Sequence, residues 1–555
     1  MTSVFKWYNL SQAIGALIDN AVKMLAVIYL VTVLKRDLAA TLALTSALLV
    51  FPFLLFSNWA GALTDRFSKR TLVVAVKWAE LGLLLLGFPA LAADQAWPIL
   101  AVLFLLAAQS AFFGPVKRGI VPELVAPDDL ARANGQMTGA TYLAIILGLF
   151  LPSFAATALN LSCSAVLAAC AGFSLIGLLC AYRLPPTPAA NRLSSPSPWI
   201  VPDALRAMRS LTPRVWLKRA AFGSIAFSGI AALFQQNLVV YAREVVNLPV
   251  ASSGYLFLLV AGGIAAGAWL AGRLSPHAVE VGLIPVGACA LALTLLGLGL
   301  APAFSVMAPL LVLAGVAAGV CIVPLTAYLQ AEAPARNRGE LFGAIEFWSF
   351  AAMVVSSVLF YVLSERLHVN PRACMAVTGG ATLFCAVWTF VRLPAHTTRF
   401  LLSRLSRLFY RVNVTGLENL PREGGALLVA NHTAYGDATL LQSVTQRPVR
   451  FVMSREVFAT WGWCRPIFKL TGAIPLHAGD GPRALVTALN HARDVLRDGG
   501  LLGIFPEGQL TRTGALQPFR KGFEKIAQGT GAPIVPVYLG NLWGSAFSFR
   551  HGAPA

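Results

Sequence analysis

The chain has 555 residues, of which 57% are hydrophobic and only 12% are charged, whereas a soluble protein carries about 25% charged residues. This deficit excludes a wholly soluble protein and indicates that much of the chain faces lipid. The formal charge of +19 favours basic loops held against anionic headgroups over a nucleic-acid partner, because no zinc-finger or RNA-binding signature is present in the sequence. The eight cysteines form no C-x-x-C pair, so we expect neither a metal site nor a disulfide framework.

Twelve apolar runs approach the roughly 20 residues that a membrane-spanning helix needs. A polar stretch rich in Pro and Ser separates the sixth run from the seventh. The sequence therefore predicts an N-terminal six-helix bundle at 1–182, a flexible cytoplasmic linker at 183–216 and a C-terminal six-helix bundle at 217–395. The predicted spans are about 10–33, 41–63, 72–93, 97–116, 137–159, 161–182, 217–241, 252–272, 279–300, 304–328, 341–363 and 372–392.

The charge of the loops predicts the orientation of the spans. Lys and Arg gather in the loops that follow even-numbered spans, whereas the opposite loops are nearly bare except for Lys35–Arg36 and the stretch 365–372. By the positive-inside rule, both ends of the bundle pair are cytoplasmic, and we expect a multi-pass membrane protein.

After Arg392 the pattern changes to short apolar runs between polar turns. The runs 426–430, 449–453, 501–505 and 534–539 are typical of buried strands, and 437–445, 483–497 and 520–528 are typical of helices. Alternating strands and helices predict an α/β domain at 396–555. Because the last span ends on the inner side, we expect this domain in the cytoplasm.

A glycine and charged residues follow the second span in the segment G-A-L-T-D-R-F-S-K-R, from Gly61 to Arg70. This segment resembles the signature of the major facilitator family, G-x-L-x-D-R-x-x-x-R/K. Gly61 allows close helix approach, and Asp65 and Arg66 can form charge interactions that lock neighbouring helix ends. We therefore predict a conformational latch of Gly61, Asp65, Arg66 and Arg70; an ordinary basic loop is the alternative. The matching place in the second half keeps only Ala271–Gly272–Arg273, so that latch is expected to be degraded.

A second segment narrows the expected substrate. The stretch G-P-V-K-R-G-I-V-P-E-L from Gly114 to Leu124, followed by Ala133–Asn134–Gly135, resembles the bacterial lysophospholipid transporter branch of this family. A weaker match to this stretch occurs in the second half, at 323–330 and again at 338–340. Internal repeats in this fold predict such a match.

Charged residues inside spans are functional candidates by default. Asp19, Asn20 and Lys23 fall in the first span; Asp19 and Lys23 share a helical face and either neutralise each other or line a polar cavity for a zwitterionic headgroup. In the second interpretation, Lys117 meets the phosphate and Glu346 meets the amine. Lys77 and Glu80 are three residues apart and are better explained as a structural pair.

An H-x-x-x-x-D motif, His432 to Asp437, follows the first predicted strand of the α/β domain. Acyl transfer to a lipid hydroxyl needs a base near neutral pH, which an imidazole supplies, and a carboxylate can hold the imidazole tautomer and stabilise its charged form. Alone, the motif is weak, because a structural histidine explains it equally well.

Three later blocks strengthen it: Phe505–Gly508 (F-P-E-G), Phe519–Gly522 (F-R-K-G) and Ile534–Val537 (I-V-P-V). The ordered set resembles the glycerolipid acyltransferase family that includes 1-acylglycerol-3-phosphate acyltransferase. The resemblance implies His432 as base, Asp437 as its partner, and Glu507 and Gly508 in acceptor binding. A phosphate-bearing acceptor requires cations, for which Arg512, Arg520 and Lys521 are candidates; a solvated basic face is the alternative.

Two departures concern the acceptor. Leu510 stands where the family's F-P-E-G-T-R carries Arg. The block Gly472–His477 matches the family's second sequence block only loosely. Both are more like the 2-acylglycerophosphoethanolamine acyltransferase branch. In similar bacterial fusions an acyl-carrier-protein synthetase domain follows, so an acyltransferase domain truncated near Ala555 is one interpretation.

The two halves together resemble a bacterial fusion of a lysophospholipid transporter with an acyl-[acyl-carrier-protein]–phospholipid O-acyltransferase. The resemblance implies that lysophosphatidylethanolamine is flipped across the inner membrane and reacylated, with acyl carrier protein or coenzyme A as the acyl donor and no bound cofactor or metal. The expected partners are the lysophospholipid, acyl carrier protein and the bilayer. Two alternatives remain: an acyltransferase whose bundle is only an anchor, and a solute or drug exporter fused to an acyltransferase.

Overall fold

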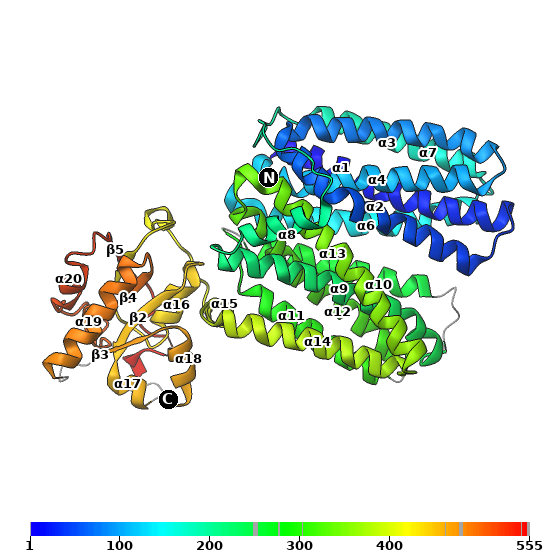
Figure 1. The fold of residues 1–555 in the computed structure, drawn as a ribbon. Helices are drawn as coiled ribbons and strands as arrows, with labels where there is room; N and C mark the ends of the chain where they lie inside the picture. Colours follow the sequence, from blue (N-terminus) through cyan, green and yellow to red (C-terminus); the bar gives the residue numbers. More distant parts are fainter. Residues whose placement is uncertain are drawn as a thin grey trace. The chain divides into compact units, whose positions relative to one another are not determined.

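The computed structural model describes residues 2–247, 253–275, 278–301, 303–460, 462–476, 481–545 and 547–551. The chain divides into two compact units, Met1–Trp388 and Thr389–Ala555 (Figure 1). The boundary lies within the last helix of the first unit, whereas the sequence places the start of the α/β domain at 396.

Twelve helices among the described residues are long and apolar enough to cross a membrane, which confirms the predicted number. Several begin or end beyond the predicted apolar run, because hydropathy detects only the lipid-facing part of a helix. A π-helical turn, Tyr29–Val33, extends the first helix. The spans are α1 (Ser3–Ile28), α2 (Leu38–Arg66), α3 (Lys69–Ala92), α4 (Ala96–Gly119), α6 (Leu130–Thr157), α7 (Cys163–Tyr182), α9 (Val215–Glu244), α10 (Ser253–Leu274), α11 (Leu283–Leu300), α12 (Phe304–Glu332), α13 (Arg338–Tyr361) and α14 (Pro371–Arg392).

The two halves of the first unit meet mainly along two helix pairs, α2 with α13 and α6 with α10. Small residues permit the contact. A Cβ on Gly61 would lie 2.6 Å from the carbonyl oxygen of Gly339, and one on Gly135 would lie 2.5 Å from that of Ala268. Both distances are far below van der Waals contact, so the backbones touch at these positions. The close approaches lie towards the end of the bundle that carries the Arg- and Lys-rich loops, called the basic end below.

The linker between the halves is fixed by specific contacts, although its Pro and Ser content predicts flexibility. The N–H of Asn191 donates to the carbonyl oxygen of Asp65 at 2.7 Å, and the Ser194 hydroxyl donates to Glu340 at 2.7 Å. Its helix α8 (Ile200–Ser210) packs against both α2 and α13. Long-range hydrogen bonds, which composition does not reveal, order this segment. The short helix α5 (Val121–Leu124) connects α4 towards α6.

The second unit is built on a five-stranded parallel sheet with strand order β3-β2-β4-β1-β5. Helix α16 packs on one face through the apolar side chains around Leu441, and α19 and α20 pack on the other around Val495 and Ile526. The elements are α15 (Pro394–Phe409), β1 (Ala426–Ala430), α16 (Asp437–Val444), β2 (Val449–Ser454), α17 (Arg455–Thr460), α18 (Arg465–Leu470), β3 (Ile474–Leu476), α19 (Pro482–Arg497), β4 (Leu501–Ile504), α20 (Gly522–Ala527) and β5 (Ile534–Val537).

Burial explains which strands the sequence predicts well. Every residue of β1 and β4 is buried, as expected for central strands of a parallel sheet covered on both faces. These strands therefore appear as continuous apolar runs. Strand β3 has only three residues, including Pro475, so it lacks this signal and is missing from the predicted strands.

Candidate functional site

A histidine and an aspartate meet at the carboxyl end of β1. His432 lies two residues after β1, and Asp437 is the first residue of α16. The contact joins Nδ1 of His432 to Oδ2 of Asp437 at 2.9 Å. The Asp437 side chain is fully buried, whereas that of His432 is 22% exposed. The motif residues are therefore in contact, and the imidazole stays accessible from outside.

Backbone donors hold the Asp437 carboxylate in place. Its Oδ2 also accepts the N–H groups of Thr433 at 2.6 Å and Ala434 at 2.9 Å. The loop between β1 and α16 thus closes around a single carboxylate oxygen. When Nδ1 of His432 donates to this oxygen, the lone pair is left on Nε2, which is then the nitrogen that can accept a proton.

Aromatic stacking fixes the plane of the imidazole. The rings of His432 and Phe505 are 4.1 Å apart between centroids and inclined by 13°. Phe451, on the neighbouring strand β2, continues the stack at 6.0 Å from Phe505. The ring therefore has two restraints, a hydrogen bond at one edge and an aromatic face, which together limit its rotation.

Glu507, expected to contact the acceptor, is bonded within the protein. One carboxylate oxygen accepts the N–H of His432 at 2.8 Å and the other accepts the N–H of Gln517 at 3.0 Å. Its side chain is buried. Glu507 thus ties the Phe-Pro-Glu-Gly turn to the backbone of His432 and to the loop that precedes α20.

The three predicted phosphate ligands differ in their distance from this turn. Gly508 has φ +73°, and a Cβ there would lie 2.9 Å from Nε of Arg520; Arg520 therefore lies directly against the turn, and it is exposed. Arg512 instead sits over the ring of Phe549 at 5.8 Å. Lys521 is exposed at the N-terminal boundary of α20. Of the three, Arg520 is the cation held against the Phe-Pro-Glu-Gly turn.

Asn431 is a site-building residue that the sequence analysis did not select. Its side-chain NH₂ donates to the carbonyl oxygen of Leu539 at 3.1 Å, and its side-chain oxygen accepts the N–H of Leu539 at 2.7 Å. This two-point bond joins the loop after β1 to the segment after β5. The asparagine directly before His432 is the sequence feature that could have indicated this role. An amide side chain carries both an NH₂ donor and an oxygen acceptor, so it can bond the C=O and the N–H of one backbone residue at the same time.

The latch residues of the first unit separate into two groups. Asp65 is fully buried and accepts the N–H groups of Gly339 at 2.7 Å and Glu340 at 2.9 Å, at the start of α13. Gly61 lies in the same contact. Arg66 and Arg70 instead make their contacts within the N-terminal half, over Phe67 and to the carbonyl oxygen of Tyr182. Asp65 thus joins the halves through a helix N-terminus rather than through an ion pair with Arg66.

At the equivalent α6–α10 contact, Gly272 occupies the place that Asp65 has in the first half, and it packs against the backbone of Arg132. A buried amide pair lies nearby: Asn134 donates to Gln330 at 2.5 Å, and Gln330 donates to the carbonyl oxygen of Arg118 at 3.1 Å. This pair joins α6 to α12, so neutral amides lie beside the second contact where the first contact contains a carboxylate.

The polar residues of α1 point to different neighbours. Asp19 accepts a hydrogen bond of 2.7 Å from the hydroxyl of Ser110 on α4, and its Oδ1 has no partner within the described residues. Asn20 bonds the carbonyl oxygen of Ala16 in its own helix. In the part of the chain that the structure describes, Asp19 and Lys23 form no ion pair, so the mutual neutralisation considered from their spacing does not occur.

Glu346 and Lys117 lie at the contact between the two halves. The Glu346 carboxylate, on α13, lies directly against Gly114 on α4, and its Oε2 has no partner among the described residues. Lys117 donates to the Thr141 hydroxyl at 3.2 Å, and it lies on the same stretch of α4 as Gly114, which contacts Glu346, and Ser110, which bonds Asp19. One cation and two incompletely bonded carboxylates therefore lie in one neighbourhood.

Lys77 and Glu80 form a buried ion pair on α3 at 2.8 Å, each 1% exposed. The hydroxyl of Ser174 on α7 also donates to Glu80 at 2.8 Å. This arrangement agrees with a structural pair.

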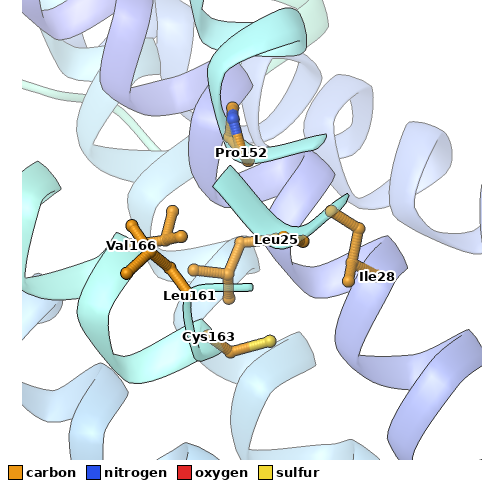
Figure 2. Close-up of a pocket in the computed structure, with 7 residues that line it drawn as sticks. Leu25, Ile28, Pro152, Leu161, Cys163 and Val166 are labelled. Atoms are coloured by element: carbon orange, nitrogen blue, oxygen red, sulfur yellow. The ribbon is translucent and has the colours of Figure 1, made fainter. Parts of the chain in front are cut away.

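Two cavities of the first unit are lined mainly by apolar side chains. Figure 2 shows one of about 10 Å³ between α1, α6 and α7, lined by Leu25, Ile28, Pro152, Leu161, Cys163 and Val166; it is at most large enough for one water molecule. Another, of about 220 Å³, lies between α2, α3 and α4, with Gln109 as its one polar lining residue. No cluster of three or more His, Cys, Asp or Glu side chains suited to a metal occurs among the described residues.

The fold and sites define a polytopic membrane protein of transporter architecture that carries an α/β acyltransferase domain. The family model "Major Facilitator Superfamily" matches residues 13–357, and the model "Acyltransferase" matches residues 411–540. The lysophospholipid transporter LplT of Klebsiella pneumoniae is 30% identical over 294 residues, which cover 51% of this chain and 69% of that protein. The chain therefore belongs to the Major Facilitator Superfamily, in the family of the transporter LplT.

The acyltransferase domain has relatives of its own. A chloroplastic 1-acyl-sn-glycerol-3-phosphate acyltransferase of Brassica napus is 34% identical over 134 residues, and one of Borreliella burgdorferi is 30% identical over 131 residues. Each match covers 24% of this chain. The chain spans 38% of the length of the plant enzyme and 52% of the bacterial one.

Solved structures support the fold of the first unit. The human organic anion transporter MFSD10 aligns with a TM-score of 0.56 at 16% identity, over 70% of this chain and 99% of that chain. The E. coli fucose:proton symporter FucP aligns with a TM-score of 0.55 at 14% identity, over 69% and 98%. At these identities the likeness concerns the fold alone.

Proposed function

We propose that this protein moves lysophospholipid, with lysophosphatidylethanolamine as the headgroup class, across the bacterial inner membrane and reacylates it on the cytoplasmic side. The observation that carries the enzymatic half is the His432–Asp437 pair beside the Phe-Pro-Glu-Gly turn, in a domain that matches the acyltransferase family. The observation that carries the transport half is membership of the LplT family.

The geometry supports direct attack by the lipid hydroxyl. Nε2 of His432 takes the proton from the free glycerol hydroxyl as its oxygen attacks the carbonyl carbon of an acyl thioester. The C–O bond forms, the C–S bond breaks, and the imidazolium returns the proton to the departing thiolate. Asp437, held by backbone donors, stabilises the imidazolium in between. The acyl group thus moves from sulfur to oxygen, and no serine or cysteine of the protein is acylated.

The acyl donor is a substrate rather than a bound cofactor. Acyl carrier protein and coenzyme A both present a thioester on a phosphate-bearing arm, which suits a basic domain. From Thr389 to Ala555 the sequence has nineteen Lys and Arg against nine Asp and Glu. Arg520, against Gly508, is our candidate for the phosphate of the acceptor, with Arg512 and Lys521 as more peripheral cations.

The charges inside the bundle fit a zwitterionic headgroup better than a passive anchor. Lys117 complements a phosphate, and the unbonded oxygens of Asp19 and Glu346 complement an amine. Asp19 and Lys117 belong to the N-terminal half and Glu346 to the C-terminal half, so a bound headgroup would contact both halves of an alternating carrier. An anchor requires no such groups, which are costly to keep in a membrane.

The orientation of the protein follows from its loops. The basic end of the bundle faces the cytoplasm by the positive-inside rule, and α14 ends on that side. The tethered domain then works at high local concentration on lysolipid released at the inner leaflet.

The proposal is tested in proteoliposomes with a fluorescent lysolipid placed in the outer leaflet. We expect Asp19→Asn and Lys117→Ala to abolish flipping, and His432→Ala to abolish acylation while flipping continues. Asn20→Ala is the matched control, because Asn20 bonds only its own helix in the structure. Flipping that survives both Asp19→Asn and Lys117→Ala would remove the transport assignment, and acylation by His432→Ala would remove the catalytic one. A panel of headgroups gives the preference.

A further inference from the structure

A segment near the C-terminus folds back onto the loop between β1 and α16. Ala434 in that loop forms an antiparallel bridge with Ser548, and the N–H of Tyr435 donates to the carbonyl oxygen of Phe547 at 3.1 Å. We call residues 547–551 the return segment. The match to the acyltransferase family ends at residue 540, so the return segment is a part of the site that the family match does not include.

Specific contacts hold the return segment in place. The buried hydroxyl of Ser548 accepts the N–H of Gly544 at 3.0 Å and donates to the carbonyl oxygen of Ser545 at 2.8 Å. Just before it in the chain, Trp543 packs on Gly514, where a Cβ would lie 2.9 Å from the indole ring. The segment is therefore fixed against two loops of the candidate site: the loop between β1 and α16, and the loop that follows the Phe-Pro-Glu-Gly turn.

Phe549 of the return segment lies between an aromatic ring and a cation. Its ring centroid is 6.0 Å from that of Tyr435, with the planes inclined by 47°, and the guanidinium carbon of Arg512 lies 5.8 Å from the Phe549 centroid. Tyr435 is 36% exposed, and Arg512 is exposed. These three side chains, Tyr435, Phe549 and Arg512, form a partly open surface that we call the aromatic platform.

The aromatic platform is close enough to His432 for one lysolipid to contact both. Tyr435 follows His432 by three residues, so their Cα atoms are at most about 11 Å apart. The N–H of Thr511, directly before Arg512, donates to the carbonyl oxygen of His432 at 3.1 Å. In a lysolipid with an ethanolamine headgroup, the ammonium extends up to about 10 Å from the free glycerol hydroxyl. A hydroxyl at His432 therefore leaves the headgroup within reach of the platform.

The chemistry of the platform suits a headgroup that carries both charges. A guanidinium binds phosphate oxygens, and an aromatic face attracts an ammonium that lies within about 6 Å of its centroid. A carboxylate would also attract the ammonium, but it would repel the neighbouring phosphate, whereas a ring carries no formal charge. The sequence has no Asp or Glu at 431–436, 508–516 or 541–551, so in these segments the rings are the groups that attract an ammonium.

We propose that the aromatic platform is a headgroup subsite of the acyltransferase domain, and that it selects acceptors with an ammonium group beside the phosphate. The faces of Tyr435 and Phe549 hold the ammonium, and Arg512 supplements Arg520 at the phosphate. This inference rests on the proposed function. It names the residues that separate lysophosphatidylethanolamine from lysophosphatidate, whose headgroup ends at the phosphate.

The selection is tested on the full chain in nanodiscs with lysophosphatidylethanolamine, its N-acetyl derivative, which lacks the positive charge, and lysophosphatidate. In the wild type, kcat/KM should be about 2- to 30-fold higher for lysophosphatidylethanolamine than for the N-acetyl derivative, as expected for a cation–π contact. Tyr435→Leu should remove this difference, mainly through KM. Tyr435→Phe keeps the ring and should keep the difference. Val486→Ala on α19, where the side chain is 54% exposed, is the control.

Lysophosphatidate separates recognition from folding. Turnover of lysophosphatidate by Tyr435→Leu would show that the variant is folded and that its loss concerns the ammonium. The same preference in the wild type and in Tyr435→Leu would overturn the inference. An equal loss of activity on all three acceptors would also overturn it, because Tyr435 would then be a structural residue.

A binding measurement separates this inference from the proposed function. Saturation-transfer NMR with water-soluble glycerophosphoethanolamine should give a lower Kd for the wild type than for Tyr435→Leu, and the N-acetyl form should bind both chains equally. Equal Kd values for glycerophosphoethanolamine would contradict the platform alone. A wild-type chain inactive on all three acceptors would contradict the proposed enzyme function, and the binding result would still decide the role of the platform.

Discussion

One carboxylate oxygen, Oδ2 of Asp437, organises the loop that carries His432. It accepts hydrogen bonds from the imidazole and from two backbone N–H groups. Asp437 therefore has two roles, a structural one in the loop and an electrostatic one towards the imidazole. The sequence indicates the pairing because the spacing of H-x-x-x-x-D places both residues on one strand-to-helix turn. It does not reveal the backbone donors, which depend on how that turn closes.

The variant Asp437→Asn separates the structural role of Asp437 from its electrostatic role. The amide oxygen can keep the N–H bonds of Thr433 and Ala434, so we expect little change in the thermal unfolding midpoint. The neutral amide cannot stabilise an imidazolium, and the acyl transfer rate should fall by about 10²- to 10⁴-fold. Initial rates with lysolipid and acyl thioester measure this effect. Asp494→Asn, at an exposed position on α19, is the control, and an unchanged rate for Asp437→Asn would remove the carboxylate from the mechanism.

Glu507→Gln tests what the Phe-Pro-Glu-Gly turn does. A glutamine has one acceptor oxygen, so it cannot receive the N–H groups of both His432 and Gln517 on separate oxygens. If Glu507 positions His432, kcat should fall by about 10- to 100-fold, similar to the loss of outer supports at other sites, and the KM for lysolipid should stay nearly constant. A raised KM with unchanged kcat would instead support the acceptor-binding role that the family resemblance implies.

At the scale of elements, burial explains both the successes and the omissions of the sequence analysis. Strands β1 and β4 and the twelve spans are long apolar runs, and hydropathy finds them. Strand β3, helix α15 and the ordered linker leave no such signal. In α15 the apolar side faces outward, so the helical pattern gives no hint of which side contacts the domain.

The ion pair on α3 should be essential to that helix. Lys77→Met leaves Glu80 as an uncompensated buried charge and should destabilise the first unit by about 3–5 kcal/mol. Lys77→Met/Glu80→Leu removes both charges and should recover most of this loss. Thermal unfolding midpoints in detergent measure both variants. A double variant no more stable than Lys77→Met would show that the pair contributes more than charge compensation.

The first turn of α15 gives the second unit a pH dependence. Burial, with a smaller contribution from Arg399, lowers the pKa of His396 to about 4, against about 6.5 in an unfolded chain. Between these two pH values the unfolded chain binds more protons than the folded chain. As far as His396 is concerned, the free energy of unfolding is therefore highest above pH 6.5 and falls as the pH decreases towards 4. His396→Leu should remove about 2 kcal/mol of the loss expected by pH 5. Unfolding midpoints at pH 7.5 and 5.0 test this, with exposed His491→Leu as control.

At the scale of the whole molecule, the two pseudo-equivalent contacts between the halves are chemically different. The α2–α13 contact carries the Asp65 carboxylate on the N-terminus of α13. Beside the α6–α10 contact, the neutral pair Asn134–Gln330 joins α6 to α12. Both lie on the basic end, and the linker adds Ser194 on Glu340.

Asp65→Ala should loosen this end of the bundle. The change removes two charge-assisted hydrogen bonds from buried N–H groups, a loss of about 1–3 kcal/mol, and therefore favours states in which α2 and α13 separate. Distances between spin labels at R66C and R336C, both exposed positions, should become longer and broader than in the parent. Asp203→Ala, in an i,i+3 pair on α8, is the control. Identical distance distributions would show that Asp65 does not restrain the halves.

The sequence by itself determined the features that depend on local chemistry: twelve spans in two halves, an α/β domain, and the His432–Asp437 pair. Each follows from apolar run length or from a fixed spacing on one turn. The tertiary structure decided the partners of the buried charges. Asp19 bonds Ser110 rather than Lys23, Asp65 bonds the N-terminus of α13, and Glu507 bonds two backbone N–H groups. These partners lie far apart in the chain, and only packing brings their donors within hydrogen-bond distance.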